Sequence, residues 1–593
     1  MKRGLTLTPF SLVAPSGMWF GAGRKGVAVH SLAYLLASLI LPRSFTKIFT
    51  EVSGVKSMFD VLVADKLAAE GIAMLKAQTD VKVTIKEKWE KGEMAAELGK
   101  YDGVIIRSGV KITAEDLAKP GKLKAIARAG VGVDNVDVAA ATKAGVLVMN
   151  TPDANTITTA EHTITMMMAL SRKVTVADAS LRSGAWDRNK FMGTQLAGKT
   201  LGVIGFGRIG KAVAKRALGL ELKVVAHDPF FFAETALDGQ VKMVKSIDDL
   251  LPLCDYITVH VPGGDTKGLI NAERIAKCKK GVRFINCARG GIIDEAALAA
   301  AIKSGQVAGA AIDVYEPEPP PKDLEILTLG DKVVVTPHLG ASTTEAQTAA
   351  STDVVAGLLT YLRGEGLVGA VNAGGVEVNL NPQEKAYADL AQRMGTILAA
   401  IVENGFDSIT LRTNGELPKR ITNTLQRMAV MALLKPFLTD SLNVVNAFHM
   451  AESRGIAVRS ETMGQAYQRA IQHSIELEIT EKTSGETKTH TVIGTVFADN
   501  APRIMAIKGY WMDMVAAGPM VLIVNQDKPG VIGIVGTTCG KLGVNIADMT
   551  LSRKGNKALM VLKLDSPIST EALEALRREP HLEVVKTVML PPL

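Results

Sequence analysis

Three side chains that could act together on a 2-hydroxy acid stand near the ends of short apolar segments in mid-chain: Arg289, Glu318 and His338. An imidazole can take a hydroxyl proton, and a guanidinium can hold a carboxylate through two parallel hydrogen bonds. A carboxylate beside the imidazole fixes its tautomer and stabilises the imidazolium. Each residue alone could be an ordinary surface or loop residue, but all three follow successive predicted strands of one nucleotide fold. We therefore expect them to form a catalytic group.

A glycine fingerprint precedes this group. Gly205, Gly207 and Gly210 follow the apolar segment 200–204 and open a predicted helix. Gly205 permits a tight turn, Gly207 lets the backbone approach a pyrophosphate, and Gly210 lets the helix pack against the strand. The helix N-terminus then faces the phosphates. A second strand ends at Asp228, whose carboxylate can accept hydrogen bonds from both ribose hydroxyls and would repel a 2′-phosphate. The sequence thus predicts an NAD site.

The elements that must position these residues alternate between apolar strands and amphipathic helices, which predicts an α/β fold with mainly parallel sheets. The fingerprint comes long after the first predicted strand, so we expect a separate α/β lobe before the nucleotide domain. A helix at about 160–172 would cross between the lobes. The strands expected in the first lobe are 61–64, 103–107, 123–128 and 146–149, and those expected later in the nucleotide domain are 257–262, 282–289, 308–314 and 333–336.

Composition excludes several classes of protein. The chain has 593 residues, is 47% hydrophobic and has a mean hydropathy of +0.18, but no apolar run reaches the roughly twenty residues that a membrane span needs. The net charge of +8 is concentrated at the N-terminus, so it does not indicate nucleic-acid binding. The four cysteines have no metal-ligand spacing and are expected to be reduced thiols, and no metal site is expected.

Residues 1–57 differ from the rest of the chain. They hold seven lysines and arginines against one acidic residue, with an apolar run at 27–41 that is too short to span a membrane. The segment is either an organelle transit peptide or the product of a mis-assigned start. Met58 begins a well-formed strand and would serve as a natural N-terminus, which favours a cytoplasmic protein. We therefore exclude residues 1–57 from the reasoning about the fold.

Several motifs resemble those of a known family, the D-isomer-specific 2-hydroxyacid dehydrogenases. The motifs are Asn286-Cys-Ala-Arg-Gly-Gly-Ile-Ile-Asp-Glu295, Asp313-Val-Tyr-Glu-Pro-Glu318-Pro and Pro337-His-Leu-Gly-Ala-Ser-Thr343. Within that family, three further segments resemble the long-form D-3-phosphoglycerate dehydrogenases, namely Ile106-Arg-Ser108, Arg128-Ala-Gly-Val-Gly-Val-Asp-Asn135 and Asn150-Thr-Pro152. The resemblance covers nearly the whole chain from Met58.

The resemblance implies a role for each matching residue. Arg289 would hold the substrate carboxylate, His338 would be the acid/base, and Glu318 would be its partner. The residues implied for NAD are Gly205, Gly207, Arg208, Ile209, Gly210, Asp228, Val261, Cys287, Ala288, Asp313, Gly340 and Ala341. Those implied for the substrate lobe are Arg107, Ser108, Arg128 and Asn155. Because a phosphomonoester needs convergent cations, Arg128, Arg188 and Lys190 are phosphate candidates.

The C-terminal half resembles a regulatory module. From residue 519 the predicted order βαββαβ, with Asp527-Lys-Pro-Gly530 and Gly543-Val-Asn545-Ile, resembles an ACT domain, a small-molecule sensor that commonly pairs across subunits. In serine-sensing members the amino acid binds at the positions of Asn525, Asp527 and Asn545. Because Asn525 stands where some members have His or Tyr, the domain could instead serve only for dimerisation. Residues 376–515 resemble the α+β intervening domain of the long form, with strands expected at 489–496 and 503–507.

Together these observations predict an enzyme of five parts. They are an N-terminal extension (1–57), a substrate domain (58–157 and 340–374), a Rossmann domain for NAD (158–339), an intervening regulatory domain (376–515) and an ACT domain (519–593). The resemblance implies NAD-dependent oxidation of 3-phospho-D-glycerate to 3-phosphohydroxypyruvate, at the entry to serine biosynthesis, by a homodimer or homotetramer with L-serine as a possible effector. The alternatives are a glyoxylate or hydroxypyruvate reductase and an NAD-sensing, corepressor-like binding protein. No nucleic-acid or membrane partner is expected.

Overall fold

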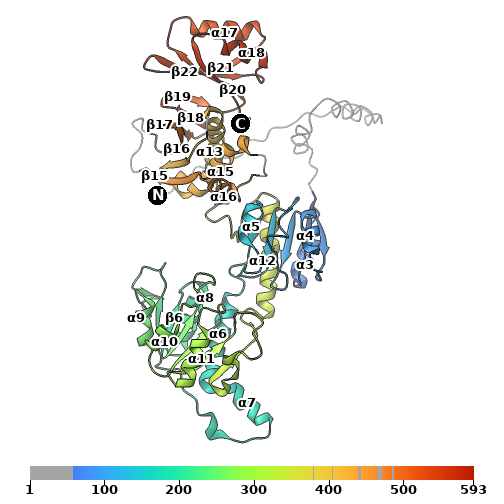
Figure 1. The fold of residues 1–593 in the computed structure, drawn as a ribbon, viewed down its shortest axis with the longest axis vertical. Helices are drawn as coiled ribbons and strands as arrows, with labels where there is room; N and C mark the ends of the chain where they lie inside the picture. Colours follow the sequence, from blue (N-terminus) through green and yellow to red (C-terminus); the bar gives the residue numbers. More distant parts are fainter. Residues whose placement is uncertain are drawn as a thin grey trace, which may run out of the picture. The chain divides into compact units, whose positions relative to one another are not determined.

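The computed structural model describes residues 58–592 except 378–379, 404, 439–441, 464–470 and 484–485. The expectations for residues 1–57 lie outside the described residues. The described chain forms four sheets (Figure 1). The division into domains expected from the sequence stays a prediction. Among the helices of the described residues, none has the length and apolarity needed to cross a membrane.

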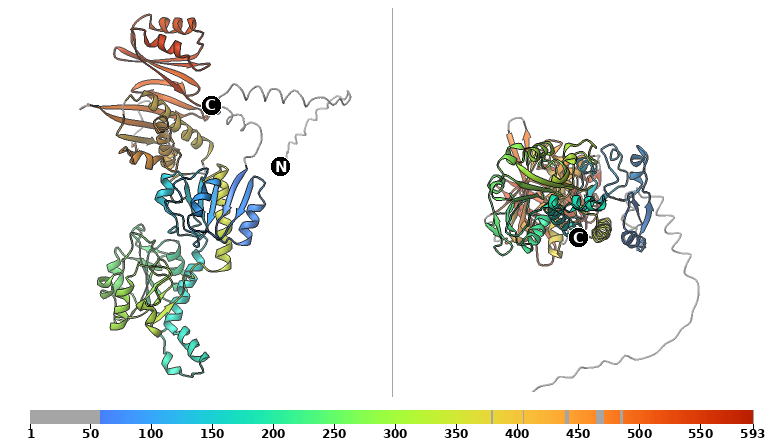
Figure 2. Two further views of the ribbon diagram at one scale, coloured as in Figure 1. Left: turned by 45° about the vertical axis from the view of Figure 1, so that its right-hand side comes forward. Right: turned by 90° about the horizontal axis from the view of Figure 1, so that it is seen from below.

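The first sheet is parallel, with the order β2-β1-β3-β4-β5. Its strands are β1 (Phe59–Val63), β2 (Val81–Ile85), β3 (Gly103–Ile106), β4 (Ala125–Arg128) and β5 (Leu147–Met149). Its helices are α3 (Ala69–Lys76), α4 (Glu93–Glu97), α5 (Val138–Lys143) and, from much later in the chain, α12 (Thr344–Leu362). Helix α12 packs on β3, β4, β5 and α3, and it lies beside these strands in Figures 1 and 2. The chain therefore returns to this lobe after His338, as the sequence predicts.

The second sheet has the order β13-β12-β11-β10-β6-β7-β9-β8 and is parallel except for β8. Its strands are β6 (Thr200–Ile204), β7 (Lys223–His227), β8 (Thr235–Ala236), β9 (Val241–Met243), β10 (Tyr256–Val259), β11 (Val282–Asn286), β12 (Val307–Ile312) and β13 (Val333–Val335). The strand order reverses between β6 and β10, and in open α/β sheets a ligand binds at the carboxyl ends of the strands beside such a reversal. This is the doubly wound topology expected for a Rossmann domain.

Helices cover the second sheet. The strand β6 continues into α8 (Arg208–Gly219), which packs against α6 (Thr156–Arg172), and α6 in turn contacts β11, β12 and β13. The sequence expects α6 at about 160–172, and the structure starts it one turn earlier. The next helix, α7 (Val174–Arg182), has no buried residue in the described structure. The remaining helices are α9 (Ile247–Leu250), α10 (Ala272–Ala276) and α11 (Glu295–Ser304).

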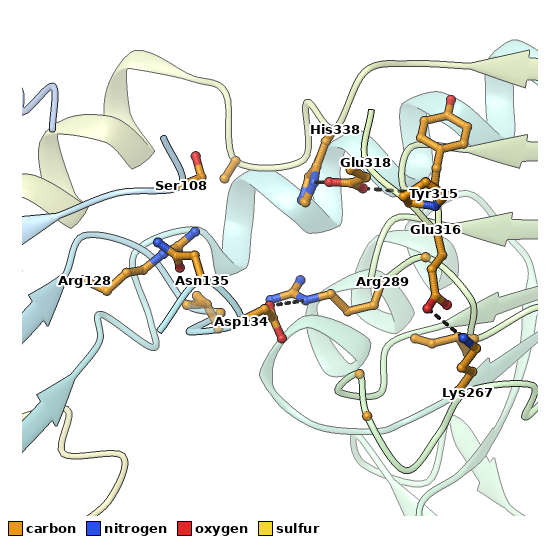
Figure 3. A pocket seen from close by; sticks show the side chains of 18 of the residues that line it. Ser108, Arg128, Asp134, Asn135, Lys267, Arg289, Tyr315, Glu316, Glu318 and His338 are labelled. Carbon is orange, nitrogen blue, oxygen red and sulfur yellow. Dashed lines mark hydrogen bonds and ion pairs between the residues drawn. The ribbon is translucent and has the colours of Figure 1, made fainter. Parts of the chain in front are cut away.

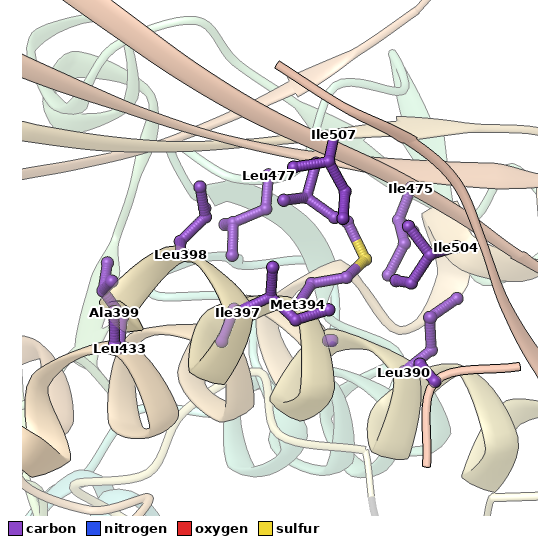
Figure 4. Close-up of a cluster of buried hydrophobic side chains, with 14 of the residues drawn as sticks. Leu390, Met394, Ile397, Leu398, Ala399, Leu433, Ile475, Leu477, Ile504 and Ile507 are labelled. Atoms are coloured by element: carbon purple, nitrogen blue, oxygen red, sulfur yellow. The ribbon is translucent and has the colours of Figure 1, made fainter. Parts of the chain in front are cut away.

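The third sheet, β15-β14-β16-β17-β18-β19, is antiparallel except for the β14–β15 pair. Its strands are β14 (Ser408–Asn414), β15 (Ala457–Thr462), β16 (Ser474–Thr483), β17 (Glu486–Val496), β18 (Pro502–Ile507) and β19 (Tyr510–Val515), and its helices are α13 (Pro382–Ile401), α14 (Glu416–Arg420), α15 (Thr422–Leu434) and α16 (Ala447–Glu452). Helix α13 begins with a capping box. Figure 4 shows Leu390, Met394 and Leu398 of α13 pointing toward the sheet, where they pack in one buried apolar core.

The fourth sheet, β21-β22-β20-β23, is antiparallel. Its elements follow in the order β20 (Pro519–Gln526), α17 (Val531–Lys541), β21 (Ile546–Lys554), β22 (Lys557–Leu564), α18 (Thr570–Arg577) and β23 (Leu582–Met589). This βαββαβ order is the one predicted for an ACT domain. Val521 and Ile523 of β20 belong to the core under α17 and α18, whereas Leu522 belongs to the α13 core, because successive side chains of a strand alternate between the two faces.

Candidate active site

His338 and Glu318 form a hydrogen-bonded pair. Nδ1 of His338 lies 2.8 Å from Oε2 of Glu318, and the other carboxylate oxygen accepts the backbone N–H of Tyr315 at 3.1 Å (Figure 3). Burial alone would raise the pKa of Glu318, but these two hydrogen bonds, together with the charge of Arg289, hold the pKa below its ordinary value. Glu318 is therefore ionised at neutral pH. With Nδ1–H donating to this carboxylate, Nε2 of a neutral His338 ring is the proton acceptor.

The loop that carries His338 is anchored by Asp313, which is completely buried at the end of β12. Its carboxylate accepts hydrogen bonds from the Thr336 hydroxyl (2.6 Å) and from the backbone N–H groups of Leu339 (2.8 Å) and Gly340 (2.9 Å). His338 has a φ of +57°, a left-handed conformation that is strained for histidine. Burial would raise the pKa of Asp313, but His162 and the loop's donors lower it. The predicted NAD residue Asp313 thus also holds the backbone on both sides of His338.

Arg289 faces His338 across a cavity of about 660 Å³. Its Nη1 donates to the Ala288 carbonyl at 2.7 Å, and its Nε lies 3.0 Å from Oδ2 of Asp134, which follows β4 of the first sheet. The cavity is therefore lined from both the first and the second sheet. Of the residues predicted for the substrate lobe, it brings together Ser108, Arg128 and Asn155.

Arg128 is the most unusual cation of this cavity. Its Nε is buried and has no hydrogen-bond partner among the described residues. A Cβ on Gly130 would lie 1.8 Å from Nη1 of Arg128, so a side chain there would displace the guanidinium from this position. Burial and the charge of Arg289 lower the pKa of Arg128 to about 10, which still leaves it cationic at neutral pH. Asp134 and Asp65 only partly offset this lowering, and a buried guanidinium N–H without a hydrogen-bond partner is costly, so this geometry suits an anionic ligand.

Three other predicted cations do not line the cavity in the described structure. Arg107 donates from Nη1 to the Lys66 carbonyl at 3.4 Å. Arg188 and Lys190 are exposed in the short 3-10 helix Arg188–Phe191 that follows α7. The cavity instead includes residues that the sequence reasoning missed, namely Lys111, Asp134, Asn135, Lys267, Tyr315 and Glu316. Asp134, Asn135, Tyr315 and Glu316 stand inside the motifs that carry the family resemblance and could have been found, whereas Lys111 and Lys267 carry no signal beyond their charge.

An adjoining cavity of about 400 Å³ is reached from the glycine fingerprint by Ile209, but by none of its three glycines. Gly205 has a φ of +91°, and a Cβ on Gly210 would lie 2.1 Å from the Gly205 carbonyl oxygen, whereas a Cβ on Gly207 would meet no atom within 4 Å. Gly205 and Gly210 thus allow the tight turn and the close approach of the helix to it, and Gly207 leaves open backbone for a pyrophosphate. The predicted residues that line this cavity are Ile209, Val261, Cys287, Ala288, Gly340 and Ala341. The site therefore fits a dinucleotide.

Six predicted cofactor residues stand outside this cavity lining, namely Gly205, Gly207, Arg208, Gly210, Asp228 and Asp313. The Asp228 carboxylate accepts the backbone N–H groups of Phe206 at 2.8 Å and of Phe230 at 2.9 Å, so it links the glycine turn to the end of β7. Each carboxylate oxygen retains a lone pair for a ribose hydroxyl. Arg208, at the start of α8, forms an ion pair with Asp153 at 2.7 Å. Burial raises the pKa of the neighbouring Cys287 thiol to about 12, so it is neutral in the cavity wall.

Comparison with known proteins agrees with this architecture. Residues 164–340 match the D-isomer specific 2-hydroxyacid dehydrogenase NAD binding domain, 383–508 the D-3-phosphoglycerate dehydrogenase intervening domain, and 520–581 the ACT domain. The chain is 39% identical over 537 residues to a D-3-phosphoglycerate dehydrogenase of Methanocaldococcus jannaschii, covering 90% of this chain and 100% of that protein. It is 38% identical to the Bacillus subtilis protein of the same name, with the same two coverages. The chain belongs to the D-3-phosphoglycerate dehydrogenase family.

Membership in this family confirms that the domain built on the second sheet binds NAD. The chain is an NAD-dependent oxidoreductase, as the sequence predicts. A relative from Arabidopsis thaliana, D-3-phosphoglycerate dehydrogenase 3, chloroplastic, is 36% identical over 541 residues and covers 88% of this chain and 91% of that protein. The ACT domain of the family is likewise present here.

In this dehydrogenase Asn525 and Asp527 lie at the carboxyl end of β20, whereas Asn545 precedes β21 at the opposite end of the ACT sheet. Asn525 is buried, its amide donates to the Gln526 carbonyl at 2.7 Å, and its Oδ1 has no partner among the described residues. Asp527 pairs with Arg553 at 3.3 Å. Asn545 donates to Asp565 at 2.6 Å. The amides and carboxylates are present, but each is partly occupied by contacts within the chain.

Proposed function

We propose that this dehydrogenase oxidises 3-phospho-D-glycerate to 3-phosphohydroxypyruvate with NAD, in the first step of serine biosynthesis. The observation that carries the proposal is Arg128, whose buried Nε has no hydrogen-bond partner among the described residues, in the same cavity as Arg289 and His338. Two guanidinium groups on one cavity suit a ligand with an anionic group at each end. His338 lines the same cavity and can accept the proton of a hydroxyl group between the two anions. The names and the extent of the relatives support the same substrate.

The roles follow from the geometry. Arg289 holds the carboxylate, Arg128 holds the phosphate, and Nε2 of His338 takes the proton of the 2-hydroxyl group. Glu318 stabilises the imidazolium that forms and keeps the ring in the tautomer that can act as a base. The residues that line the adjoining cavity would hold NAD, which would supply the acceptor for the hydride of C2. Residues that follow strands of both sheets line the cavity.

A direct assay tests this proposal. NADH formation is measured with 3-phospho-D-glycerate and with D-glycerate, which lacks the phosphate. We expect the wild type to prefer the phosphorylated acid and Arg128→Ala to raise its KM about a hundredfold, because a charge-assisted contact is lost, while D-glycerate is hardly affected. Arg274→Ala, whose side chain pairs with Asp248 away from the cavity, is the control. Preferred reduction of glyoxylate would identify the reductase alternative, and NAD binding without turnover would identify the sensor.

We further propose that the enzyme is a homo-oligomer joined through α7 and the segment that follows it. No residue of α7 is buried in the described structure, and Trp186 and Met192 are 74% and 79% exposed. Such apolar groups call for a partner surface. Arg188 and Lys190, which do not reach the cavity of their own chain, could then serve that of a second copy. Light scattering of the wild type should give a dimer or tetramer, and Trp186→Ser should shift it toward a monomer; a monomeric wild type would refute this part.

L-serine remains the proposed effector of the ACT domain. Asn525, Asp527 and Asn545 offer amide and carboxylate groups of the kind that bind an α-amino acid. We expect serine to lower turnover in the wild type and to lose that effect in Asn545→Ala. Unchanged turnover at millimolar serine, with no heat of binding by calorimetry, would leave the domain as an assembly module.

For location we propose the cytoplasm, with a plastid or mitochondrion as the alternative if residues 1–57 are a transit peptide. The chloroplastic relative makes the alternative concrete. The mass of the native protein's N-terminal peptide and the fractionation of its source cells decide between the two. A mature N-terminus near Met58 in an organelle fraction would support the alternative, and the same terminus in the cytosol would support our proposal.

A further inference from the structure

The Arg289 guanidinium is seated on a turn of the first lobe. Its Nε donates to Oδ2 of Asp134 at 3.0 Å, and Figure 3 shows the two side chains meeting beside the cavity. A Cβ on Gly132 would lie only 1.9 Å from Nη2 of Arg289, so the guanidinium packs directly on the backbone of this turn. The turn follows β4 of the first sheet, and Arg289 follows β11 of the second sheet. The contact therefore forms only when the two lobes fold around the cavity.

The contact with Asp134 leaves only some N–H groups of the Arg289 guanidinium free to bind a substrate carboxylate. A carboxylate can bind arginine side-on, through Nε and Nη2, or end-on, through Nη1 and Nη2. Asp134 occupies Nε and so blocks the side-on mode. Nη1 donates one of its two hydrogens to the Ala288 carbonyl, and its second hydrogen is free to bind a ligand. Nη2 has no hydrogen-bond partner among the described residues.

We propose that Asp134 is a positioning residue, which fixes the rotation of Arg289 and presents the Nη1–Nη2 end to the substrate carboxylate. The inference rests on the role proposed for Arg289, but not on the phosphate, since every 2-hydroxy acid has the carboxylate. Asp134 itself is 72% exposed in its side chain, and its carboxylate contacts Arg289 at the cavity wall. Its effect on the substrate therefore passes through Arg289.

Charge alone predicts the opposite effect, which makes the direction of the change decisive. Asp134 is an anion beside a cavity built for anions, so removing its charge should tighten substrate binding by simple electrostatics. A positioning role predicts weaker binding instead, because a freed Arg289 must be ordered by the substrate itself. The two explanations cannot both hold for one variant.

The experiment compares Asp134→Ala, Asp134→Asn and the wild type. We expect Asp134→Ala to raise the KM, and the calorimetric Kd in the presence of NADH, about tenfold or more, with a smaller change in kcat. Asp134→Asn should recover part of the loss, since its amide oxygen can still accept from Nε. In an Arg289→Lys background, which has no Nε, Asp134→Ala should have little further effect. The control is Asp248→Ala, which removes a similar exposed Nε contact, to Arg274 at 3.2 Å.

The outcomes separate this inference from the proposed function. If the wild type oxidises 3-phospho-D-glycerate but Asp134→Ala leaves the KM and Kd unchanged or lowers them, the positioning role is wrong and the function stands. If the wild type prefers another 2-hydroxy acid, the substrate proposal is wrong, and the same comparison made with that acid still decides the role of Asp134. An equal loss in Asp248→Ala would also overturn the inference.

Discussion

Nδ1 of His338 lies 2.8 Å from the carboxylate of Glu318, and this contact sets which ring nitrogen can act as a base. If His338 takes the substrate's proton, His338→Ala should lower kcat by about three orders of magnitude, because general base catalysis contributes on the order of 10²–10⁴. The affinity for NADH, measured by its fluorescence on binding, should stay within about twofold, since the dinucleotide contacts lie mainly on other residues. Near-normal turnover would remove His338 from the mechanism.

Glu318→Gln tests the second half of this pair. The amide has no charge to stabilise the imidazolium, and its N–H₂ can turn toward Nδ1 and favour the inactive tautomer, so we expect kcat to fall about a hundredfold. Because the pKa of Glu318 is held below its ordinary value, the carboxylate stays ionised well into the acid range. Glu316→Gln is the matched control, since Glu316 pairs with Lys267 at the cavity wall. An equal loss in both variants would show that the pair with His338 has no special role.

Asp228 offers a test of cofactor choice. Asp228→Ser removes the carboxylate that would repel a 2′-phosphate and weakens the link from the glycine turn to Phe230. We expect kcat/KM with NAD to fall about tenfold to a hundredfold and the NADP/NAD ratio of kcat/KM to rise. Initial rates with both dinucleotides at saturating substrate give these values. A ratio that stays the same would place the discrimination elsewhere in the cavity.

How much of this site could be predicted depended on where each residue stands on its element. Arg289 and His338 follow the carboxyl ends of parallel strands, which share one edge of a sheet, so their proximity could be inferred from the strand pattern alone. Lys111 and Lys267 lie on loops of different lobes. Their place at the cavity depends on how the loops pack, which no local pattern records.

The fold could be predicted to a similar extent from the pattern of strands and helices. The expected strands of the first two sheets are short and apolar, and the structure confirms them with differences of up to three residues at their ends. The return of the chain through α12 was required by the mid-chain position of the fingerprint. The exposure of Arg188 and Lys190 was not predictable, because their charges suited a phosphate while their position on an exposed turn is set by tertiary structure.

Glu384 provides a test of stability in the third sheet's domain. It is 2% exposed, accepts the Asn381 backbone N–H at 2.9 Å in the capping box of α13, and accepts Nε of Arg420 at 2.6 Å. Glu384→Gln should lower the free energy of unfolding by about 1–3 kcal/mol, because a buried charge-assisted network is weakened. Urea unfolding followed by circular dichroism measures the loss, and Glu416→Gln, at a 91% exposed glutamate, is the control.

The pH dependence of this loss has a definite sign. Burial would raise the pKa of Glu384, but Arg420 and the Asn381 N–H hold it below its ordinary value of 4.5. A carboxyl group with a lowered folded-state pKa contributes its stability in full above the unfolded value and loses it as the pH falls through the folded value. The difference between wild type and Glu384→Gln should therefore be constant above about pH 5.5, roughly one unit above the unfolded pKa, and should shrink on acidification. A difference that grows as the pH falls would contradict the assigned ion pair with Arg420.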